Sequence, residues 1–398
     1  MTDKLIADTD FAFLKSGEIF LDNAASTQKP EIVIETIADF YRHSYANIHR
    51  ANYRRAAVAT EAYEAARKVT ANFINASPSN IIFTKGATEA INLVAHSFIA
   101  DQIKDDEEVI ISEIEHHSNL LPWQYLAQQG KFKLKIWRLN QQNKLAIADL
   151  KALITSKTRL IALSQMANLT GYLPPFNEVA RLCQKHHIWF LLDACQAIAH
   201  LKIDVKKLPV DFLMFSAHKI YGPSGVGALY LADSHLASAK PYQLGGGTVS
   251  QVSLEAANYL PPPQFYDEGT PSFSETIVMF IALTYVKDLG LEQIIAYEDE
   301  LYQYLFNELS QLPNYQIFSA PETGKAIIAF IHRKAHASDI ATLLNQQQIS
   351  VREGFHCAEP YARKLGVKSM IRASLAVYNN FRDIDRLIIA LKKIEKFF

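Results

Sequence analysis

The sequence predicts an α/β protein with a large domain, built on a mostly parallel seven-stranded sheet flanked by helices, and a smaller α+β domain at the C-terminus. Short apolar runs alternate with longer amphipathic segments between residues 60 and 290. The apolar runs are continuous stretches of Val, Ile, Leu and Phe, which is typical of strands buried on both faces of a parallel sheet. The pattern then changes to long helical segments and isolated strand-like pieces, which indicates the second domain.

The expected elements follow in order along the chain. Strands are expected over residues 80–84, 107–115, 133–139, 158–166, 188–194, 211–217 and 227–232, and helices over residues 61–74, 88–100, 121–130 and 176–187. The proline-rich segment 260–271 is expected to be a loop. The C-terminal part is expected to contain mostly helix over residues 283–312, a strand over 325–333 and an amphipathic helix over 381–398.

We therefore assign residues 17–287 to the large domain, and residues 1–16 and 288–398 to the small one.

Composition excludes several classes of function. The net charge of −1 provides no basic surplus for a nucleic-acid backbone. The three cysteines, Cys183, Cys195 and Cys357, form no CxxC pair, so neither a disulfide framework nor a zinc site is indicated, and we expect no metal. The N-terminus carries three aspartates within 20 residues, unlike a signal or transit peptide, and no apolar run reaches a membrane span. We expect a cytoplasmic protein without a membrane or nucleic-acid partner.

Two strand ends carry the residue types that pyridoxal 5′-phosphate requires. Asp193 follows the apolar run "WFLL", and Lys219 follows "FLMFSAH". In parallel sheets, ligands bind beyond the carboxyl ends of the strands. The cofactor needs a lysine for its covalent Schiff base and an acid against its ring nitrogen. Taken singly, such an aspartate more often caps a helix, and such a lysine is usually only solvated.

Two further strand ends complete a candidate cofactor site. In "FTKGATEA", a glycine turn precedes Thr88 at the start of a helix, where free N–H groups favour a phosphate. Ser216 and His218 could complete the phosphate site, and His116 of "EIEHHSN" could stack on the cofactor ring. Each could also be an ordinary helix cap or polar loop residue. Their occurrence together at strand ends of one sheet favours the cofactor, and no phosphate-loop or dinucleotide-binding glycine motif is present.

The segment "REGFHCAEP" holds the third cysteine, Cys357, near Arg352 and His356. A lone cysteine is more often a small buried apolar residue than a nucleophile. A pyridoxal site in the same chain reverses that preference for Cys357. Cys183 and Cys195 keep the interpretation of packing residues.

These segments together resemble the class V branch of the fold-type I pyridoxal-phosphate enzymes, and within it the group II (SufS/CsdA-like) cysteine desulfurases. The resemblance extends nearly from end to end. It is carried by "FLDNAASTQKP", "GATEAINLVAHSF", "EHHSNLLPWQ", "DACQA", "FSAHKIYGPSGVGALY", "EGTPSFSE", "REGFHCAEP" and "IRASLAVYN". The motif around Cys357 distinguishes desulfurases from other members of class V.

The resemblance implies a role for each candidate residue. Around the cofactor, it implies a Schiff base on Lys219, Asp193 at the pyridine nitrogen, Gln196 at the ring hydroxyl, His116 on the ring face, and phosphate contacts from Ala87, Thr88, Ser216 and His218. It implies that Thr270 reaches the phosphate of the other subunit of a homodimer. Around the substrate, it implies that Asn168 and Arg372 hold the carboxylate, with Arg352 and Tyr53 nearby.

The implied reaction converts L-cysteine to L-alanine and leaves the sulfur on Cys357 as a persulfide, with Arg352 and His356 favouring the thiolate. No long insertion separates Cys357 from Arg372, and in the resembled family a short cysteine loop accompanies a shielded persulfide and a dedicated SufE-, CsdE- or SufU-like acceptor. The sulfur would serve iron–sulfur cluster assembly or other sulfur trafficking.

Alternatives remain open: a selenocysteine lyase, a cysteine-sulfinate desulfinase, or an idle assembly scaffold. The residues Tyr53, Ala87, Glu353 and Phe355 depart from the family pattern.

Overall fold

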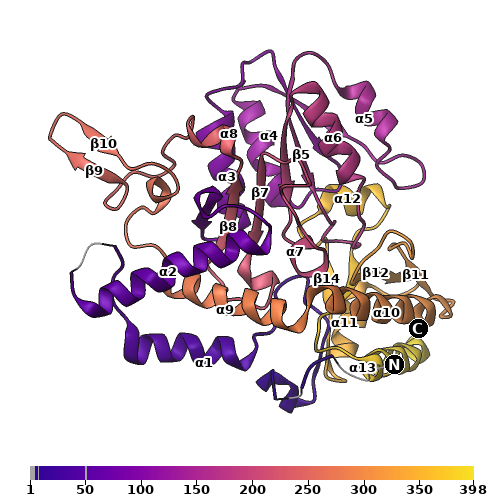
Figure 1. The fold of residues 1–398 in the computed structure, drawn as a ribbon. Coiled ribbons are helices and arrows are strands. Elements are labelled where there is room, and N and C mark those ends of the chain that lie inside the picture. The colour runs from indigo at the N-terminus through magenta and orange to yellow at the C-terminus, as the bar shows by residue number, and fades with distance from the viewer. Residues whose placement is uncertain (1–4, 8, 50–51) are drawn as a thin grey trace.

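The computed structural model describes residues 5–7, 9–49 and 52–398 (Figure 1). Its centre is a seven-stranded sheet in the order β2-β8-β7-β6-β5-β3-β4. The strands are β2 Ile81–Thr84, β3 Glu108–Ser112, β4 Lys133–Trp137, β5 Thr158–Ser164, β6 Trp189–Asp193, β7 Phe212–Ser216 and β8 Gly227–Leu231. Only β8 runs against its neighbours in this sheet. All seven predicted strands are confirmed, as is the mostly parallel sheet.

Both faces of this sheet are buried, as the continuous apolar runs predicted. In β6, Phe190 and Leu192 belong to one apolar cluster, whereas Leu191 between them belongs to a second cluster. Successive side chains of a strand point to opposite faces, so the two clusters are the cores on the two sides of the sheet. Such a sheet leaves only strand ends free for polar residues.

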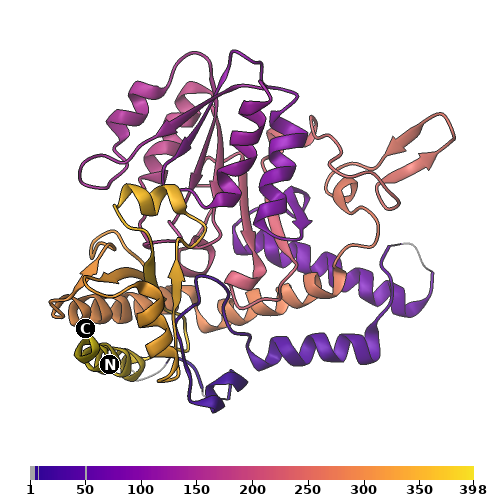
Figure 2. The ribbon, with the colours of Figure 1, turned by 180° about the vertical axis from the view of Figure 1, so that it is seen from behind.

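The helices of the large part of the chain lie on both sides of the sheet (Figures 1 and 2). They are α1 Glu31–Asp39, α2 Arg54–Phe73, α3 Ala87–Leu93, α4 Leu121–Gln128, α5 Ile147–Leu153, α6 Phe176–His186, α7 Ala197–His200, α8 Asp233–Leu236 and α9 Phe273–Leu289. The helix expected over residues 88–100 is confirmed only in part, because α3 passes into a π-helical turn at Val94–Ile99. Helices α1, α5, α7 and α8 were not predicted from the sequence.

The segment 283–312, expected to be mostly helical, is two helices. The first is α9, and the second is α10 Leu291–Ser310. Gly290 separates them with φ +84°, a conformation that residues other than glycine adopt only at a cost. Gly290 therefore ends α9, and α10 packs in the core of the C-terminal part of the chain.

The C-terminal part contains a four-stranded antiparallel sheet in the order β11-β12-β15-β14. Its elements are β11 Tyr315–Ile317, β12 Ile327–His332, α11 Ala337–Asn345, β13 Ile349–Ser350, β14 Arg352–Gly354, α12 Glu359–Lys364, β15 Met370–Ser374 and α13 Phe381–Ile394. The strand expected over residues 325–333 and the helix from residue 381 are present.

The predicted domain boundaries stay a prediction, and one contact bears on them. The short strand β1 (Ile19–Phe20), which the prediction placed in the large domain, pairs in parallel with β13 of the C-terminal part. The chain therefore passes between the two parts just after the predicted boundary at residue 17.

One hairpin stands apart from both sheets. It consists of β9 Val249–Val252 and β10 Ala257–Tyr259, and it projects away from the rest of the chain in both views (Figures 1 and 2). The loop expected over residues 260–271 follows it and contains one 3-10 turn, Gln264–Tyr266. No helix in the described part of the chain is both long and apolar enough to cross a membrane.

Candidate active site

The carboxyl ends of the parallel strands meet at one cavity of about 240 Å³. The predicted residues that line it are Ala87, Thr88, His116, Asn168, Asp193, Gln196, Ser216, His218, Lys219, Arg352, Cys357 and Arg372. Arg352 and Arg372 belong to strands of the small sheet, and Cys357 follows one of these strands. The cavity therefore lies where the two sheets meet. The structure thus brings together residues up to 285 positions apart, from Ala87 to Arg372.

Burial changes the charge states of the central acid and amine. Asp193 ends β6 and is buried, and burial raises the pKa of its carboxyl, although the backbone N–H of Cys195 donates to it at 2.9 Å. Burial also lowers the pKa of Lys219 to about 8. Asp193 has no cationic side chain in hydrogen-bonding contact among the described residues, so a protonated ring nitrogen would supply the charge that this buried acid favours.

The backbone of "DNAAS" holds two of the cofactor candidates, a role that the sequence analysis missed. The carbonyl oxygen of Ala24 accepts hydrogen bonds from the Nζ of Lys219 and from the Nε2 of Gln196, the latter at 2.8 Å. The adjacent Thr27 donates its N–H to the carbonyl oxygen of His218 at 3.0 Å. These contacts fix the lysine loop against the N-terminal segment.

Polar groups gather where the cofactor phosphate is expected. The N–H of Ala87 donates to the Oγ of Ser216 at 2.9 Å, and the hydroxyls of Thr88 and Ser118 lie 2.7 Å apart. Gly86 has φ +150°, and a Cβ there would lie 3.1 Å from the Oγ of Ser216. The close approach leaves backbone and hydroxyl groups, rather than a side chain, facing the cavity.

Two histidines of the site are neutral at physiological pH. Burial, together with the charge of Lys219, lowers the pKa of both His116 and His218 to about 4. The Nδ1 of His116 accepts from the N–H of Ser118 at 3.1 Å, so its proton is on Nε2. A neutral imidazole is suited to stacking on a cofactor ring.

Cys357 is exposed, but the loop that carries it is firmly held. Both His356 and Cys357 have left-handed backbone conformations, with φ +52° and +56°, which L-residues adopt at a cost of about 1–2 kcal/mol. The Nδ2 of Asn168 donates to the carbonyl oxygen of His356 at 2.6 Å, and the N–H of His117 donates to that of Cys357 at 2.7 Å. The ring Nε2 of His117 also accepts from the N–H of Glu359 at 3.2 Å.

His117 therefore supports the cysteine loop, a role that was not predicted from the sequence. The two adjacent histidines that follow a strand, His116 and His117, were the sequence feature that could have indicated this role.

One expectation about Cys357 is wrong. His356 was expected to favour the thiolate, but it is buried, its Nε2 donates to the carbonyl oxygen of Met370 at 3.2 Å, and burial lowers its pKa to about 3. A neutral histidine supplies no positive charge, so only Arg352 of the two provides one. The expected shielding is also not supplied by this chain, since Cys357 is exposed.

The other cysteines differ in position. Cys183 is buried, and burial raises the pKa of its thiol, as suits a packing residue. Cys195 lines the cavity, with its Sγ 3.7 Å from the Oγ of Ser216. Burial raises the pKa of Cys195 to about 12, so it remains a thiol next to Asp193.

The substrate end of the cavity holds two arginines and an unexpected acid. Arg372 is buried, and its Nη1 donates to the carbonyl oxygen of Asn168 at 2.9 Å. Asp22 accepts from Arg372 at 3.0 Å and from Arg352 at 3.3 Å. Among the described residues, the Nε of Arg372 and the Oδ1 of Asn168 have no hydrogen-bond partner. Asp22 lies in the segment "FLDNAASTQKP", but the sequence predicted no role for it.

Glu115, which precedes His116, is a second residue whose role was not predicted from the sequence. The carboxylate of Glu115 is buried and accepts from the hydroxyl of Ser112, from the N–H of Ser164 at 3.0 Å and its hydroxyl at 2.6 Å, and from Asn119 at 2.6 Å. Burial raises its pKa to about 7. Glu115 thereby ties the ends of β3 and β5 together and fixes the turn that carries His116.

Two predicted site residues lie outside the cavity. Tyr53 is half exposed at the start of α2, and Thr270 lines a separate cavity beside Lys85, Glu89 and Gly245. Neither contacts the site within this chain, so the expected position of Tyr53 near the substrate is not supported by the single chain. Thr270 lies away from the cavity that holds Lys219 in its own chain. The expected contact with another subunit would require such a position.

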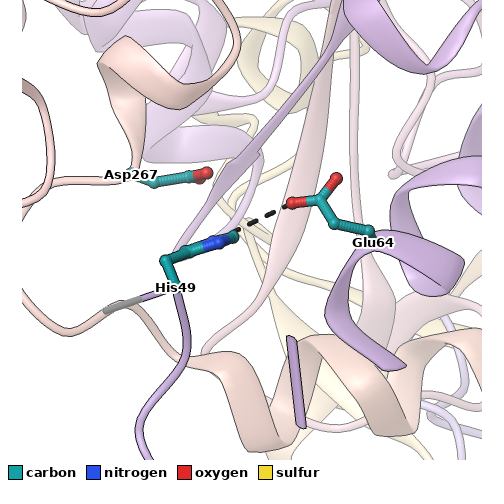
Figure 3. Close-up of side chains that lie close together, drawn as sticks. All are labelled: His49, Glu64 and Asp267. Carbon is teal, nitrogen blue, oxygen red and sulfur yellow. Dashed lines mark ion pairs between the residues drawn. The ribbon is translucent and has the colours of Figure 1, made fainter. Parts of the chain in front are cut away.

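A second cluster of polar side chains lies near the loop that carries Thr270 (Figure 3). His49, Glu64 and Asp267 place their ligand atoms within 4.8 Å of one another. Arg67 already donates to Asp267 at 2.7 Å and to Glu64 at 3.1 Å. Because this buried guanidinium compensates both carboxylates, we interpret the cluster as an ion-pair network that joins α2 to the segment before Thr270.

The cavity fits pyridoxal 5′-phosphate by its donor set. Lys219 provides the amine, Asp193 the buried acid, and Gln196 an amide beside them. Hydroxyl and N–H groups of Thr88, Ser216 and Ala87 gather where the phosphate is expected, and Arg372 and Asn168, expected at the substrate carboxylate, line the same cavity.

Comparison with known proteins identifies the family. The model of the family described as aminotransferase class V matches residues 19–387. A cysteine desulfurase of Serratia proteamaculans is 42% identical over 379 residues, which cover 95% of this chain and 93% of that protein. A probable cysteine desulfurase of Mycolicibacterium paratuberculosis is 38% identical over 97% of this chain, which spans 57% of that longer protein.

The solved structure of the cysteine desulfurase CsdA from Escherichia coli superposes with a TM-score of 0.92, at 34% identity and with 98% of this chain and 97% of that chain covered. The expected fold-type I architecture is thereby confirmed. The chain belongs to the aminotransferase class V family and, within it, to the group II, CsdA-like cysteine desulfurases, whose cofactor is pyridoxal 5′-phosphate.

Proposed function

We propose that this chain converts L-cysteine to L-alanine, that Cys357 receives the sulfur as a persulfide, and that the sulfur then passes to a separate acceptor protein. The single observation that carries this proposal is that an exposed, free thiol lines the same cavity as Lys219 and Asp193. An enzyme that only eliminated sulfide would need no thiol there. A selenocysteine lyase would depend less on Cys357.

When bound, the cofactor withdraws electrons from the substrate and so weakens its Cβ–S bond. Asp193 would keep the ring nitrogen protonated, and the neutral imidazole of His116 would lie against the ring. Arg372 holds the substrate carboxylate, to which its Nε can donate because it has no partner among the described residues, since a guanidinium pairs well with a carboxylate. The second N–H of the Asn168 amide can donate to the same carboxylate. With its pKa lowered to about 8, Lys219 can take up and return a proton near neutral pH.

The sulfur transfer balances without an external oxidant. The thiolate of Cys357 forms a bond to the substrate sulfur while the Cβ–S bond breaks. The electron pair of that bond stays with the three-carbon fragment, which gains a proton and leaves as L-alanine. Cysteine and a thiol thus become alanine and a persulfide, a product that a further thiol can attack and accept.

The proposal also includes a homodimer and a separate protein that accepts the sulfur. The hairpin β9–β10 exposes Leu254 fully and Val252 by 63%, which favours contact with a second copy of this chain. A second copy could also provide the shielding of Cys357 that the single chain does not. The free thiols of Cys183, Cys195 and Cys357 support a reducing compartment, and we place the enzyme in the cytoplasm.

The test is a visible spectrum of the purified protein before and after L-cysteine, with alanine assayed in parallel and the mass of the Cys357 peptide measured. We expect a cofactor band that responds to L-cysteine, one persulfide sulfur on Cys357, and alanine. Cys357→Ala should respond to L-cysteine yet form little alanine from it. Equal alanine formation by Cys357→Ala from cysteine and selenocysteine would favour the lyase, and a protein that cannot be loaded with cofactor would be the idle scaffold.

A further inference from the structure

The buried carboxylate of Glu115 has four hydrogen-bond donors and no cationic partner among the residues that the structure describes. Its Oε1 accepts from the hydroxyl of Ser112 and from the N–H of Ser164 at 3.0 Å. Its Oε2 accepts from the hydroxyl of Ser164 and from the Nδ2 of Asn119, both at 2.6 Å. Glu115 is 2% exposed and Asn119 is fully buried, so water is not available to replace these donors.

Two of the four donors cannot be reversed, and they face different oxygens of the carboxylate. A serine hydroxyl can turn its hydrogen away and accept instead, but the backbone N–H of Ser164 can only donate. The amide of Asn119 is fixed as well, because its Oδ1 accepts at 3.0 Å from the Nε1 of Trp123, and an indole N–H can only donate. The Nδ2 of Asn119 must therefore face Glu115. An amide in place of this carboxylate would point its NH2 at a fixed donor in either orientation.

The turn between Glu115 and Asn119 presents groups to three parts of the site. His116 lines the cavity where the cofactor ring is expected, and Ser118 lines it where the phosphate is expected. The N–H of His117 donates at 2.7 Å to a carbonyl oxygen of the cysteine loop. Two bonds of Asn119 close the turn, one to the carboxylate of Glu115 and one from its N–H to the carbonyl oxygen of His116 at 2.8 Å. The turn geometry therefore affects the ring, the phosphate and the cysteine loop together.

We propose that Glu115 is a positioning residue for both parts of the reaction: through its contact with Asn119, it fixes the turn that contacts the cofactor on one side and the loop of Cys357 on the other. Glu115 does not itself line the cavity. Its four donors favour the ionised form and oppose the effect of burial, which raises its pKa to about 7. The part of this inference that concerns Cys357 rests on the proposed function, whereas the part that concerns the cofactor does not.

Glu115→Gln is the first test, because the amide has the shape of the carboxylate but cannot satisfy both fixed donors. Pyridoxal 5′-phosphate is titrated into cofactor-free protein at about pH 8, where Glu115 is mostly ionised. We expect its dissociation constant to rise about tenfold, the effect of a lost hydrogen bond to a charged group. The circular dichroism of the cofactor band, which reports how the ring is held, should fall, and persulfide formation on Cys357 should slow about tenfold. Native values for all three would overturn the proposal.

Exchange of the acid and the amide separates the contact from overall stability. In Glu115→Gln combined with Asn119→Asp, the new amide can donate to the new carboxylate, which can still accept from Trp123, and the hydroxyl of Ser164 can turn to accept. The dissociation constant should return to within about threefold of the native value, and the circular dichroism should recover. Asn119→Asp alone sets two carboxylates against each other and should bind the cofactor as poorly as Glu115→Gln. A double variant no better than either single variant would count against the proposal, and this comparison remains decisive if Glu115→Gln does not fold.

Glu108→Gln is the matched control, because Glu108 is a buried carboxylate at the opposite end of the same strand, β3. It accepts from the hydroxyls of Thr155 at 2.6 Å and Thr158 at 3.0 Å, and it does not line the cavity. This variant should leave cofactor binding and circular dichroism unchanged, and a shift as large as that of Glu115→Gln would count against a specific role for Glu115. A native protein that forms no persulfide from L-cysteine would refute the proposed function, while cofactor binding and circular dichroism would still test Glu115.

Discussion

At the scale of single residues, burial decides which protonation states the site offers. Lys219 lies among Asp193, Arg372 and the carbonyl oxygen of Ala24, and desolvation is the largest cause of its lowered pKa. An amine with a pKa of about 8 is neutral in an appreciable fraction of molecules near neutral pH. The same lysine in solvent would be almost fully protonated and would react with the cofactor more slowly.

We expect the uptake of pyridoxal 5′-phosphate by cofactor-free protein to depend on pH accordingly. The amine of Lys219 must be neutral to form the covalent bond that holds the cofactor. The uptake rate should therefore rise about tenfold per pH unit below pH 8 and level off above it. Stopped-flow absorbance would measure this rate.

Reaction of the cofactor with Nα-acetyl-lysine is the control, and its rate should continue to rise toward pH ~10.4. Lys219→Ala should show no covalent uptake at any pH. A protein rate that follows the free amine up to that pH would contradict the lowered pKa of Lys219.

At the scale of elements, the cysteine loop illustrates how strained backbone is maintained. Two successive left-handed residues persist because neighbouring elements hold both carbonyl oxygens. The ring of His117 also accepts from the N–H of Glu359, the first residue of α12. His117 is thus a positioning residue that links the end of β3 to both sides of Cys357.

His117→Ala should loosen the cysteine loop without removing the cofactor. Loss of one hydrogen bond worth about 1 kcal/mol should slow persulfide formation on Cys357 about fivefold, while L-alanine binding and cofactor absorbance stay the same. Mass spectrometry of the Cys357 peptide in rapid-quench samples measures the rate. Amide exchange at Glu359 should also accelerate.

His117→Gln is the matched control, because its amide oxygen can accept from the same N–H and should restore most of the rate. Unaltered exchange at Glu359 in His117→Ala would show that the ring does not hold the loop.

The break between α9 and α10 is a second property of elements. Gly290 has φ +84°, and Gly290→Ala should destabilise the protein by about 1 kcal/mol and lower its Tm by about 2 °C. Differential scanning calorimetry measures the change. Gly245→Ala is the control, since a Cβ at Gly245 would meet no atom closer than 3.9 Å, and it should leave the Tm unchanged. A Tm for Gly290→Ala equal to that of the native protein would mean that the helices can join without a glycine.

At the scale of the whole molecule, the site requires both sheets and, in our proposal, two subunits. The large sheet contributes Lys219 and Asp193, and the small sheet contributes Arg352 and Arg372. Thr270 lies in a separate cavity of the same chain. If Thr270 serves the site of the partner subunit, a mutated Lys219 and a mutated Thr270 can be placed on different chains of one dimer.

Mixed dimers test this arrangement. Lys219→Ala and Thr270→Ala subunits, carrying different affinity tags, are mixed and the heterodimer is purified. Under the proposal, the heterodimer has one intact site, which combines Lys219 of one chain with Thr270 of the other, and should recover about half of the native activity. Each parent homodimer should be at least tenfold less active. A heterodimer no more active than its parents would place Thr270 in its own subunit's site or outside any site.

Much of the site could be predicted from sequence because its residues follow strands. Asp193, Ser216 and Lys219 each come at or just after the end of a continuous apolar run, and parallel strands bring such ends to one edge of the sheet. Burial on both faces makes these runs easy to recognise. The resemblance supplied the roles of Cys357 and Arg372, because Cys357 lies in a turn between β14 and α12 and Arg372 lies in the short strand β15.

The sequence alone determined the α/β class, the seven strands and the residues that gather at their ends, because hydrophobic periodicity and the residues that follow each apolar run are local patterns. Tertiary structure decided what those patterns do not encode. It brought Asp22 between two arginines some 330 and 350 positions away, held His356 neutral by burial, and used His117 to hold the loop of Cys357. These properties depend on neighbours distant in sequence and on exclusion of water, which exist only once the chain has folded.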